Sequence, residues 1–382
     1  MSGKRKKLPF PSDHSASIVC DIGSGVIKAG LVQDMTYPRL VFPSFSKKKS
    51  TQVQNLVGKE VESIFESVFS TLSSIPKGDD ANILSPSNKQ NIRTEGIGRE
   101  RGVVITENVE EISSSRNRKR KEIICEMVFE KFDFDFLNIS PSAALCLAAR
   151  GTTTGLVVDC GHAKTEVVPV CNGFVQKGNV RRLEMGGSTV TRRFIDLSKR
   201  SDSRNFFLDQ DGDFFEINSA MEKLCYVALN LAEERYVAEK TNLLNRDFFL
   251  PDKTAIFVNT ERFLAPEILF QPKFSGDVCS DSFGITDLIS DSINSSAIDS
   301  RASLFRSIIL AGGTTLLPNF PQRISQDLSS TNNSLNVYVD ACPERMFLGF
   351  RGGCVMAAMD NPDWWVTKSE FEEKGCCAIF KL

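Results

Sequence analysis

The chain reads Ile18-Val-Cys-Asp-Ile-Gly-Ser-Gly-Val-Ile-Lys-Ala-Gly30 near its start, and this stretch decides the fold. A second stretch, Gly155-Leu-Val-Val-Asp-Cys-Gly-His-Ala-Lys-Thr165, repeats its pattern: an apolar strand, an aspartate, then a glycine. Each stretch predicts a β-hairpin whose turn presents backbone N–H groups, which suit phosphate oxygens. Two such hairpins facing each other across a cleft would clamp a polyphosphate and leave Asp21 and Asp159 near its metal ion.

A single Asp-x-Gly pattern is a weak signal, because aspartate and glycine are ordinary turn residues. Two copies, each behind an apolar strand, are better evidence of a duplicated fold.

Further segments of the chain resemble actin and follow one another in the same order as in actin. They are Lys223-Leu-Cys-Tyr-Val-Ala-Leu229, Pro266-Glu-Ile-Leu-Phe-Gln-Pro-Lys-Phe274, Ser303-Leu-Phe-Arg-Ser-Ile-Ile-Leu-Ala-Gly-Gly-Thr-Thr-Leu-Leu-Pro318, Pro343-Glu-Arg345, Gly352-Gly353 and Trp365-Val-Thr-Lys-Ser-Glu-Phe371. The resemblance covers most of residues 17–45 and 103–382. The chain is therefore identified as a divergent member of the actin family.

The resemblance implies an α/β fold with two RNase-H-like lobes around a nucleotide cleft. Residues 17–151 would form the first lobe, residues 152–345 the second, and residues 346–382 would return to the first. The second lobe would carry a peripheral insertion near 190–255. Residues 1–16 are polar and basic and are expected to be a disordered leader.

Local patterns predict the smaller elements. Val103-Val-Ile-Thr106 reads as a buried strand, and Arg118 to Phe132 reads as a helix with Ile123, Ile124, Met127 and Val128 inward. Val57 to Leu72 reads as an amphipathic helix. Residues 76–102 read as an exposed loop, and the Ser/Asp-rich residues 275–300 as a loop plus a short helix.

Only residues 45–61 stand where actin has its whole subdomain 2, a small lobe whose tip contacts the next protomer of a filament. The resemblance therefore implies that subdomain 2 is largely absent. We expect the chain not to be a homopolymer, because half of the longitudinal filament contact would be missing.

The resemblance also implies the residues of a nucleotide site that holds ATP or ADP with magnesium. Asp21 and Asp159 would bind the magnesium through its water shell, and Ser24, Gly25 and Val26 would offer amides to the phosphates, with Lys28 as a point charge. The alternative is a tight glycine turn with a surface lysine. The implied cofactor-binding set is Asp21, Gly23, Ser24, Gly25, Lys28, Asp159, Gly161, Gly187, Glu222, Gly312, Gly313 and Thr314.

The second hairpin departs from the family pattern, because His162 replaces an aspartate and Ala163 a glycine. Alanine is disfavoured if that position needs a positive φ, which glycine accepts freely. His162 would either bring partial positive charge toward the phosphates or be a solvent-facing turn residue.

Two positions of the hydrolytic machinery are altered. Ser142 stands at the place of the family's water-positioning glutamine, and Glu166 at the place of its histidine. Losing such groups typically costs about 10²–10⁴-fold in rate, so ATP hydrolysis should be very slow or absent. Glu166 as a new general base is the counter-interpretation, although a carboxylate beside a triphosphate would be repelled.

The adenosine side is mixed. Leu317 stands where actin has a tyrosine, and Met346 and Met221 occupy two lysine positions beside the base. Leucine and methionine can cover an adenine face by packing, but the polar and cationic contacts are lost. Nucleotide binding is still expected.

Composition excludes several functions. A net charge of −2 gives no general reason to expect nucleic-acid binding, and no run of 18 apolar residues predicts a membrane span. Cysteines such as Cys20, Cys125, Cys146 and Cys225 lie in apolar strands, as in reduced intracellular proteins. With His14 in a polar leader, a Ser-His-Asp hydrolase would depend on His162 alone.

The sequence thus predicts a non-polymerising structural subunit of a cytoskeletal complex in the cytoplasm, with a filament-end or dynactin-like role. Its partners would be actin or other actin-related proteins, accepted on a face around Trp364-Trp365 and residues 343–356. One alternative is a nuclear subunit of a chromatin-remodelling complex, with basic runs Lys4–Lys7 and Arg116–Lys121 as nuclear signals. Another is an ATPase of the actin/sugar-kinase fold.

Overall fold

The structure is a computed structural model. It describes residues 17–43, 65–68, 71, 102–109, 115–201, 214–249, 253, 255–275, 283–331, 336–359 and 361–381. Within these ranges the chain forms two β-sheets, a separate two-stranded ribbon, and helices around them.

The strands are β1 (Ile18–Ile22), β2 (Val26–Leu31), β3 (Leu40–Pro43), β4 (Gly102–Glu107), β5 (Phe136–Pro141), β6 (Gly155–Cys160), β7 (Thr165–Cys171), β8 (Phe174–Val175), β9 (Arg181–Leu183), β10 (Arg246–Phe249), β11 (Ala255–Val258), β12 (Ile308–Ala311), β13 (Val339–Asp340) and β14 (Val366–Thr367). The α-helices are α2 (Ser115–Glu126), α3 (Ser142–Ala149), α4 (Gly187–Ser201), α5 (Phe214–Leu224), α6 (Leu231–Lys240), α7 (Glu261–Leu264), α8 (Ile285–Ser295), α9 (Ile298–Phe305), α10 (Phe320–Thr331), α11 (Leu348–Ala358) and α12 (Lys368–Lys374). Shorter helical turns that matter below are η4 (Met127–Lys131), η9 (Gly313–Leu316) and η12 (Gly375–Lys381).

The two sheets are built in the same way. In the first, the order is β14-β5-β4-β1-β2-β3, with β1 antiparallel to β2 and parallel to β4. In the second, the order is β13-β12-β6-β7-β8, with β6 antiparallel to β7 and parallel to β12. Each sheet therefore opens with a hairpin and adds parallel strands beside its first strand, which is the duplicated fold that the two Asp-x-Gly stretches predicted.

The central strands are apolar because both of their faces are covered. Every residue of β1 is buried, as is nearly all of β6, and this explains why the sequence runs apolar without alternation there. Asp21 and Asp159 are the last residue but one of β1 and of β6, directly before the glycine turns begin. Burial of the strands thus fixes where the two carboxylates lie.

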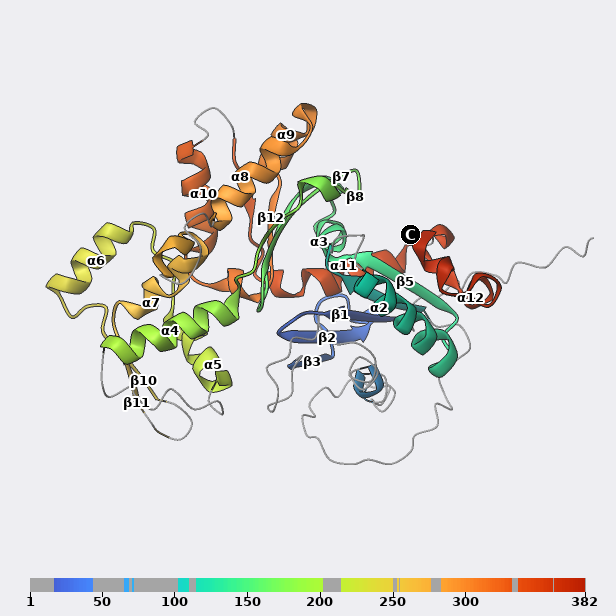
Figure 1. Cartoon of the computed structure of the whole chain (residues 1–382), viewed down its shortest axis with the longest axis horizontal. Helices are drawn as coiled ribbons and strands as arrows, with labels where there is room; N and C mark the ends of the chain where they lie inside the picture. The colour runs from blue at the N-terminus through green and yellow to red at the C-terminus, as the bar shows by residue number, and fades with distance from the viewer. Residues whose placement is uncertain are drawn as a thin grey trace, which may run out of the picture.

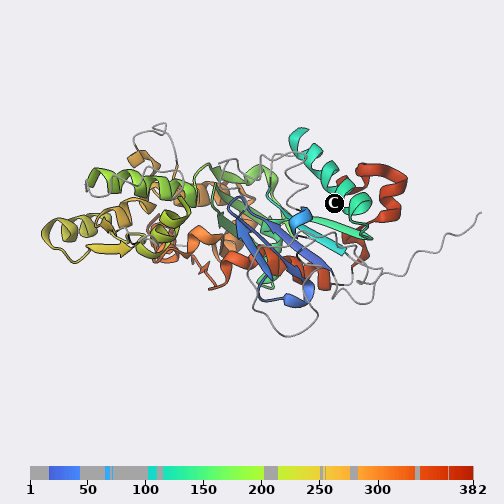
Figure 2. The same ribbon diagram turned by 90° about the horizontal axis from the view of Figure 1, so that it is seen from below.

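Helices α3 and α11 join the two halves of the molecule (Figure 1). Helix α3 packs through Ala143 and Leu147 on the second sheet, and α11 packs through Phe350 and Cys354 on the first. The two helices also pack against each other. In Figure 2 the green and yellow helices of the second half lie at one end and the red C-terminal helices at the other.

Several local predictions are confirmed. The stretch 17–45 contains β1 to β3, Val103-Val-Ile-Thr106 lies in β4, and residues 118–132 form the end of α2 followed by a π-helical turn, η4. Ile124, Met127 and Val128 are buried, while Ile123 is half-buried. The cysteines Cys20, Cys125, Cys146 and Cys225 are buried free thiols as expected, but of these four only Cys20 lies in a strand, because Cys125 and Cys146 belong to α2 and α3 and Cys225 follows α5.

Two local predictions need correction. Residues 285–305 form two helices, α8 and α9, rather than one short helix, because Ile285, Ile289 and Ile293 recur on one buried face of α8. Gly102, placed in the exposed loop, is the first residue of β4. Gly102 is buried, and a Cβ there would lie 2.7 Å from the ring of Trp365, so the strand packs its bare backbone against that ring.

Other predictions lie outside the described residues. These are the basic leader 1–16, the rest of the loop 76–102, and the shortened subdomain 2 at 45–61. Of the predicted helix from Val57 to Leu72, the described residues Phe65–Val68 and Thr71 are helical, with Phe65 and Val68 buried. The lobe boundaries near 151 and 345 stay predictions.

The partner-accepting face predicted around Trp364-Trp365 and 343–356 is partly buried. Trp365 is only 4% exposed and packs against Phe136, and most of α11 is buried against β1, β4 and α3. Trp364 and several residues of 343–356 are half-buried, so these could contact a partner, and the partner-accepting role of this face stays a prediction. Separately, no helix among the described residues is long and apolar enough to span a bilayer.

The crossing of α3 and α11 generates a stability prediction. A Cβ on Gly352 would lie 1.8 Å from the carbonyl oxygen of Leu145, so the two helices approach as closely as their backbones allow. Gly352→Ala should destabilise the chain by about 1–3 kcal/mol, although alanine is the better helix former. Thermal unfolding followed by circular dichroism measures the change.

The matched control is Gly178→Ala, because a Cβ there meets nothing within 4 Å. Its effect should stay within about 0.5 kcal/mol. Equal midpoints for the two variants would contradict the close helix crossing.

Candidate functional site

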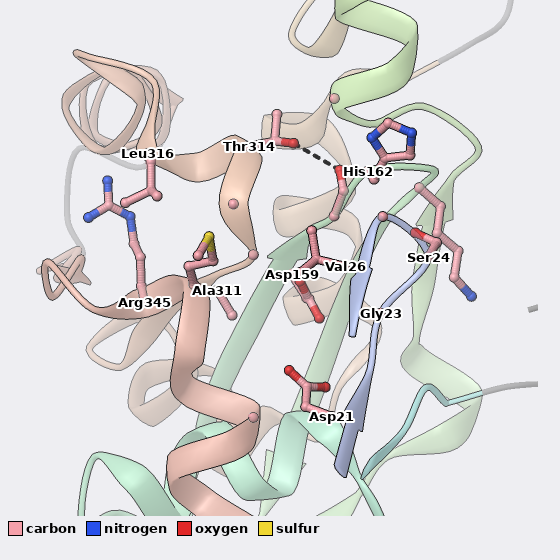
Figure 3. Close-up of a pocket in the computed structure, with 18 of the residues that line it drawn as sticks. Asp21, Gly23, Ser24, Val26, Asp159, His162, Ala311, Thr314, Leu316 and Arg345 are labelled. Carbon is pink, nitrogen blue, oxygen red and sulfur yellow. Dashed lines mark hydrogen bonds between the residues drawn. The ribbon is translucent and has the colours of Figure 1, made fainter. Parts of the chain in front are cut away.

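A cavity of about 490 Å³ lies where the two hairpin turns and the turn after β12 meet. This size is typical of small-molecule sites, about 300–1,000 Å³. Every residue that the sequence placed at a nucleotide site lines it: Asp21, Gly23, Ser24, Gly25, Lys28, Ser142, Asp159, Gly161, Glu166, Gly187, Glu222, Gly312, Gly313 and Thr314. Residues from four separate parts of the chain therefore share one cavity (Figure 3).

The two hairpin turns have matching backbone geometry and touch each other. The amide of Gly23 donates to the carbonyl of Val26 at 3.2 Å, and the amide of Gly161 donates to the carbonyl of Lys164 at 3.0 Å. Across the cleft, the amide of Ala163 donates to Ser24 Oγ at 3.2 Å. The two turns thus form a direct bridge between the two sheets.

Glycine is required at the first turn for a steric reason. A Cβ on Gly25 would lie 2.4 Å from Cβ of His162, so the first turn packs its bare backbone against the His162 side chain. His162 is accordingly half-buried, and the alternative that it is a solvent-facing turn residue is wrong.

The structure also answers the two concerns about the altered second hairpin. The pKa of His162 is lowered to about 4, first by burial and then by the nearby Arg192. The imidazole is therefore neutral at pH 7 and does not supply the positive charge considered above. Ala163 is not among the described non-glycine residues with positive φ, so alanine carries no backbone strain at this place.

Asp21 is held in a fixed orientation. Lys28 Nζ donates to its Oδ2 at 2.8 Å, and Thr106 Oγ1 donates to its Oδ1 at 2.7 Å. Burial alone would lower the pKa of Lys28, but the charge and hydrogen bond of Asp21, helped by Asp159, keep that pKa above its usual value. The lysine is consequently a permanent cation beside the carboxylate.

Asp159 is a buried acid whose charged form is disfavoured. Its pKa is raised to about 6 by burial, with Glu166 and Asp21 adding to the rise while Lys28 and Lys164 oppose it. The two lysines offset only part of the cost of burying this carboxylate, so its charged form is still disfavoured in the ligand-free site. A divalent metal carried by a phosphate ligand would stabilise that charged form.

Glu166 is not an isolated carboxylate. Its Oε1 accepts from Lys164 Nζ at 2.9 Å and from Arg182 Nε at 2.8 Å, and the residue is only 4% exposed. Because Lys164 and Arg182 both hold the same oxygen, the Glu166 carboxylate is fixed in ion pairs at the sheet, and this geometry disfavours Glu166 as a new general base. The two cations also offset the repulsion toward phosphates that the sequence alone suggested.

The turn after β12 brings backbone to the cavity wall. Gly312 has φ +86°, and a Cβ there would lie 2.3 Å from the carbonyl oxygen of Cys160. Thr314 Oγ1 donates to the carbonyl of Gly161 at 2.9 Å, which ties this turn to the second hairpin (Figure 3). Glycine at 312 is thus dictated both by conformation and by space.

Arg345 fixes the same turn from below. Its guanidinium donates to Thr315 Oγ1 at 3.0 Å, to the carbonyl of Thr315 at 2.9 Å and to that of Cys342 at 2.9 Å. Sequence reasoning quoted Pro343-Glu-Arg345 only as a family match and gave Arg345 no role. A buried guanidinium needs several hydrogen-bond acceptors, but the sequence alone does not show that Arg345 is buried.

The far end of the cavity is apolar. Met221 and Leu317 are buried, and Met346 lies beside Gly313, with its Sδ 3.6 Å from where a Cβ would be. Leu316, at 41% exposure, lies at the rim. Glu222 is exposed and accepts from Asn218 Nδ2 at 2.8 Å, which leaves a carboxylate at the edge for a sugar hydroxyl.

These residues fit a magnesium nucleotide. Among the described residues no cluster of three or more His, Cys, Asp or Glu side chains gathers to hold a metal by itself. Mg²⁺ typically keeps several waters and binds through one or two carboxylates together with phosphates of its ligand. A pair of carboxylates facing two amide-bearing turns is that kind of arrangement.

Comparison with known proteins decides the family. The family model described as Actin matches residues 12–207 and 216–381. The chain belongs to the actin family. Its two sheets and central cleft accordingly have the actin fold that the sequence indicated.

Three similar proteins carry the name actin-related protein 2. The Schizosaccharomyces pombe protein is 30% identical over 399 residues, which covers 97% of this chain and 98% of that protein. The Acanthamoeba castellanii protein is 29% identical over 95% of this chain and 98% of that protein. The Saccharomyces cerevisiae protein is 35% identical over 278 residues, 69% of this chain and 70% of that protein. The chain is thus a divergent actin-related protein.

The raised pKa of Asp159 predicts how the stability of the chain depends on pH. The pKa of Asp159 is about 6 in the folded chain against a usual 3.8, so ionisation costs more in the folded state. Stability from this group is present below about pH 4 and is lost as pH rises toward 6. Asp159→Asn should raise the unfolding midpoint of nucleotide-free, magnesium-free protein at pH 7.5, and the gain should shrink as pH falls to 4.

Asp247→Asn serves as the control, because Asp247 is an exposed acid of β10 far from the cavity lining. Its effect should be small at every pH. A lower midpoint for Asp159→Asn than for wild type at pH 7.5 would contradict the account of Asp159.

Proposed function

We propose that this chain is a nucleotide-holding structural subunit of a multiprotein complex of the cytoskeleton, built with actin or another actin-related protein. It binds ATP or ADP with magnesium and hydrolyses ATP little. The observation that carries this proposal is the convergence of Asp21, Asp159 and the two amide-bearing turns on one cavity.

The magnesium would lie between the two hairpins and contact Asp21 and Asp159 through its waters. When bound, it would neutralise phosphate charge and relieve the repulsion between the carboxylates. Lys28 and Thr106 hold the Asp21 carboxylate in place before the ligand arrives. The chain thus provides a pre-oriented acceptor rather than a complete metal cage.

The phosphates would lie against Ser24, Gly25 and the second turn. Backbone amides at such turns bind phosphate oxygens without needing specific side chains, so His162 and Ala163 are compatible with binding. The Ser24 hydroxyl now accepts from Ala163, and this bond gives way or is shared when a phosphate enters.

The base would occupy the apolar end formed by Met221, Leu317 and Met346, with Glu222 at the ribose. Thioether and leucine side chains can cover the faces of a purine ring. Because these groups offer no charge to the base edge, discrimination among purines should be modest.

Hydrolysis should be slow because the groups that position and deprotonate water are changed. Ser142 presents a short hydroxyl at the start of α3, and Glu166 is tied to Lys164 and Arg182. The proposal therefore assigns the nucleotide a structural role, in which it holds the two halves of the molecule together.

The relatives named actin-related protein 2 favour an assembly of actin-type subunits in the cytoplasm. They give no support to the nuclear alternative. Direct binding to nucleic acid or membrane is not part of the proposal, because neither the composition nor the family gives a reason for it.

The first prediction of this proposal concerns affinity. Wild-type chain should bind a fluorescent ATP analogue in the presence of magnesium, and Asp21→Ala should weaken binding at least about tenfold, because it removes a metal-water acceptor and frees Lys28. Titration by fluorescence anisotropy, with and without a chelator, measures this.

Asp247→Asn is again the control and should bind like wild type. Phosphate release from the same samples should stay near background. Magnesium-independent binding, or an Asp21→Ala variant with unchanged affinity, would count against the proposed site.

The second prediction concerns self-assembly. The chain should remain monomeric in magnesium and ATP at a concentration where actin forms filaments, because residues 45–61 are too few to build the lobe that contacts the next protomer. Sedimentation and electron microscopy of negatively stained samples test this. Helical filaments made of this chain alone would refute the structural-subunit proposal.

A further inference from the structure

Lys164 is a cation of the cavity that the family pattern does not assign. It lies at the end of the second turn, lines the cavity, and its side chain is 13% exposed. Its ammonium contacts Glu166 Oε1 at 2.9 Å. A largely buried lysine at a cavity wall needs an anionic partner, and Glu166 is the partner it has.

Glu166 does not depend on Lys164 for its own neutralisation. Arg182 Nε donates to the same Glu166 oxygen at 2.8 Å, and the two residues face each other in register on β7 and β9. Such a cross-strand pair is held by the sheet itself. Arg182 therefore pairs with Glu166 independently of Lys164, so the Lys164 ammonium, which also acts on Asp159, is not needed to neutralise Glu166.

Lys164 has a counterpart in the first hairpin. Lys28 lies on β2 and Lys164 follows the second turn, and both also line the cavity that Asp21 and Asp159 share. Burial raises the pKa of Asp159, and both lysines act against that rise. Two ammonium groups from opposite hairpins therefore act on the same carboxylate.

The cavity has a direction. Leu316 and Leu317 supply apolar side chains at the end of the cavity beside the turn after β12, where Arg345 also lies, while Asp21, Asp159 and the hairpin turns lie at the other end (Figure 3). A nucleotide with its base at the apolar end would extend its phosphate chain toward the hairpins. Its outermost phosphate would then meet Lys164 and Lys28 together.

We propose that Lys164 is a second phosphate-binding cation, which acts with Lys28 and favours a nucleoside triphosphate over a diphosphate. The inference rests on the proposed function and extends it to a residue of this chain. Glu166 serves here as a positioning residue that holds the Lys164 ammonium at the cavity wall. The site thereby exchanges a hydrolytic function for retention of the triphosphate.

The experiment compares ATP and ADP affinities, both with magnesium, for wild type, Lys164→Met, Lys164→Arg and the control Lys177→Met. Lys177 is an exposed lysine of the same half of the chain, away from the cavity lining. Lys164→Met should lose roughly tenfold or more in ATP affinity and less than about threefold in ADP affinity, since one charged hydrogen bond is removed. Lys164→Arg and Lys177→Met should keep the wild-type ratio.

A purely structural ion pair would behave differently: Lys164→Met would lower the thermal midpoint and leave the ratio of ATP to ADP affinity unchanged. That result overturns the inference. If Lys164→Met does not fold, the double variant Lys164→Met/Glu166→Gln, which removes one charge of each sign, takes its place with the same expected loss of ratio. Wild type that binds neither nucleotide would instead refute the proposed function, and the role of Lys164 with it.

Discussion

The convergence of Asp21 and Asp159 on one cavity is the constraint on which the rest of the site depends. Both carboxylates lie near the end of a buried strand and line one cavity, because each half of the molecule has a hairpin with a parallel strand beside its first strand. Asp21 is neutralised by Lys28, whereas the pKa of Asp159 rises to about 6, first through burial and then through Glu166 and Asp21. The fold thus places a buried carboxylate that is costly to ionise where a metal and its phosphates would bind, and the metal would stabilise its charged form.

Contacts around the cavity hold the two hairpins and the turn after β12 in position. Helices α3 and α11 join the halves through backbone-to-backbone packing at Gly352, and the turn after β12 is fixed by Arg345. The Ser24 hydroxyl already bridges to the amide of Ala163 across the cleft. Since these contacts come from both sheets, a ligand between the hairpins would stabilise the joint as well as the site.

The sequence was sufficient for features that depend on local pattern. An apolar run followed by Asp-x-Gly predicts a strand and its turn, and the duplicate implied that both aspartates face one cleft. Contacts between residues far apart in the sequence could not be predicted from such local patterns. Trp365 and about half of residues 343–356 are buried, and nothing local could say that Arg182 pairs with Glu166 from a neighbouring strand.

Some chemistry was likewise invisible in the sequence. Whether His162 is charged depends on its burial and on Arg192, which lies thirty positions later on α4. Whether Ala163 is strained depends on its φ, which the residue type does not give. The helices α8 and α9 were not recognised in full, because their apolar residues are separated by serines and aspartates. Residue type alone therefore located the site but did not determine its charge state.

The most direct test of this account is the unfolding midpoint in four conditions: no ligand, magnesium alone, ATP with a chelator, and magnesium with ATP. A ligand that binds only the folded state stabilises it by RT ln(1 + [L]/Kd), about 2.7 kcal/mol at a hundredfold excess over Kd. We predict that magnesium and ATP together raise the midpoint by more than the sum of their separate effects. Equal midpoints in all four conditions, or full stabilisation by ATP with the chelator, would contradict a site organised around the two carboxylates.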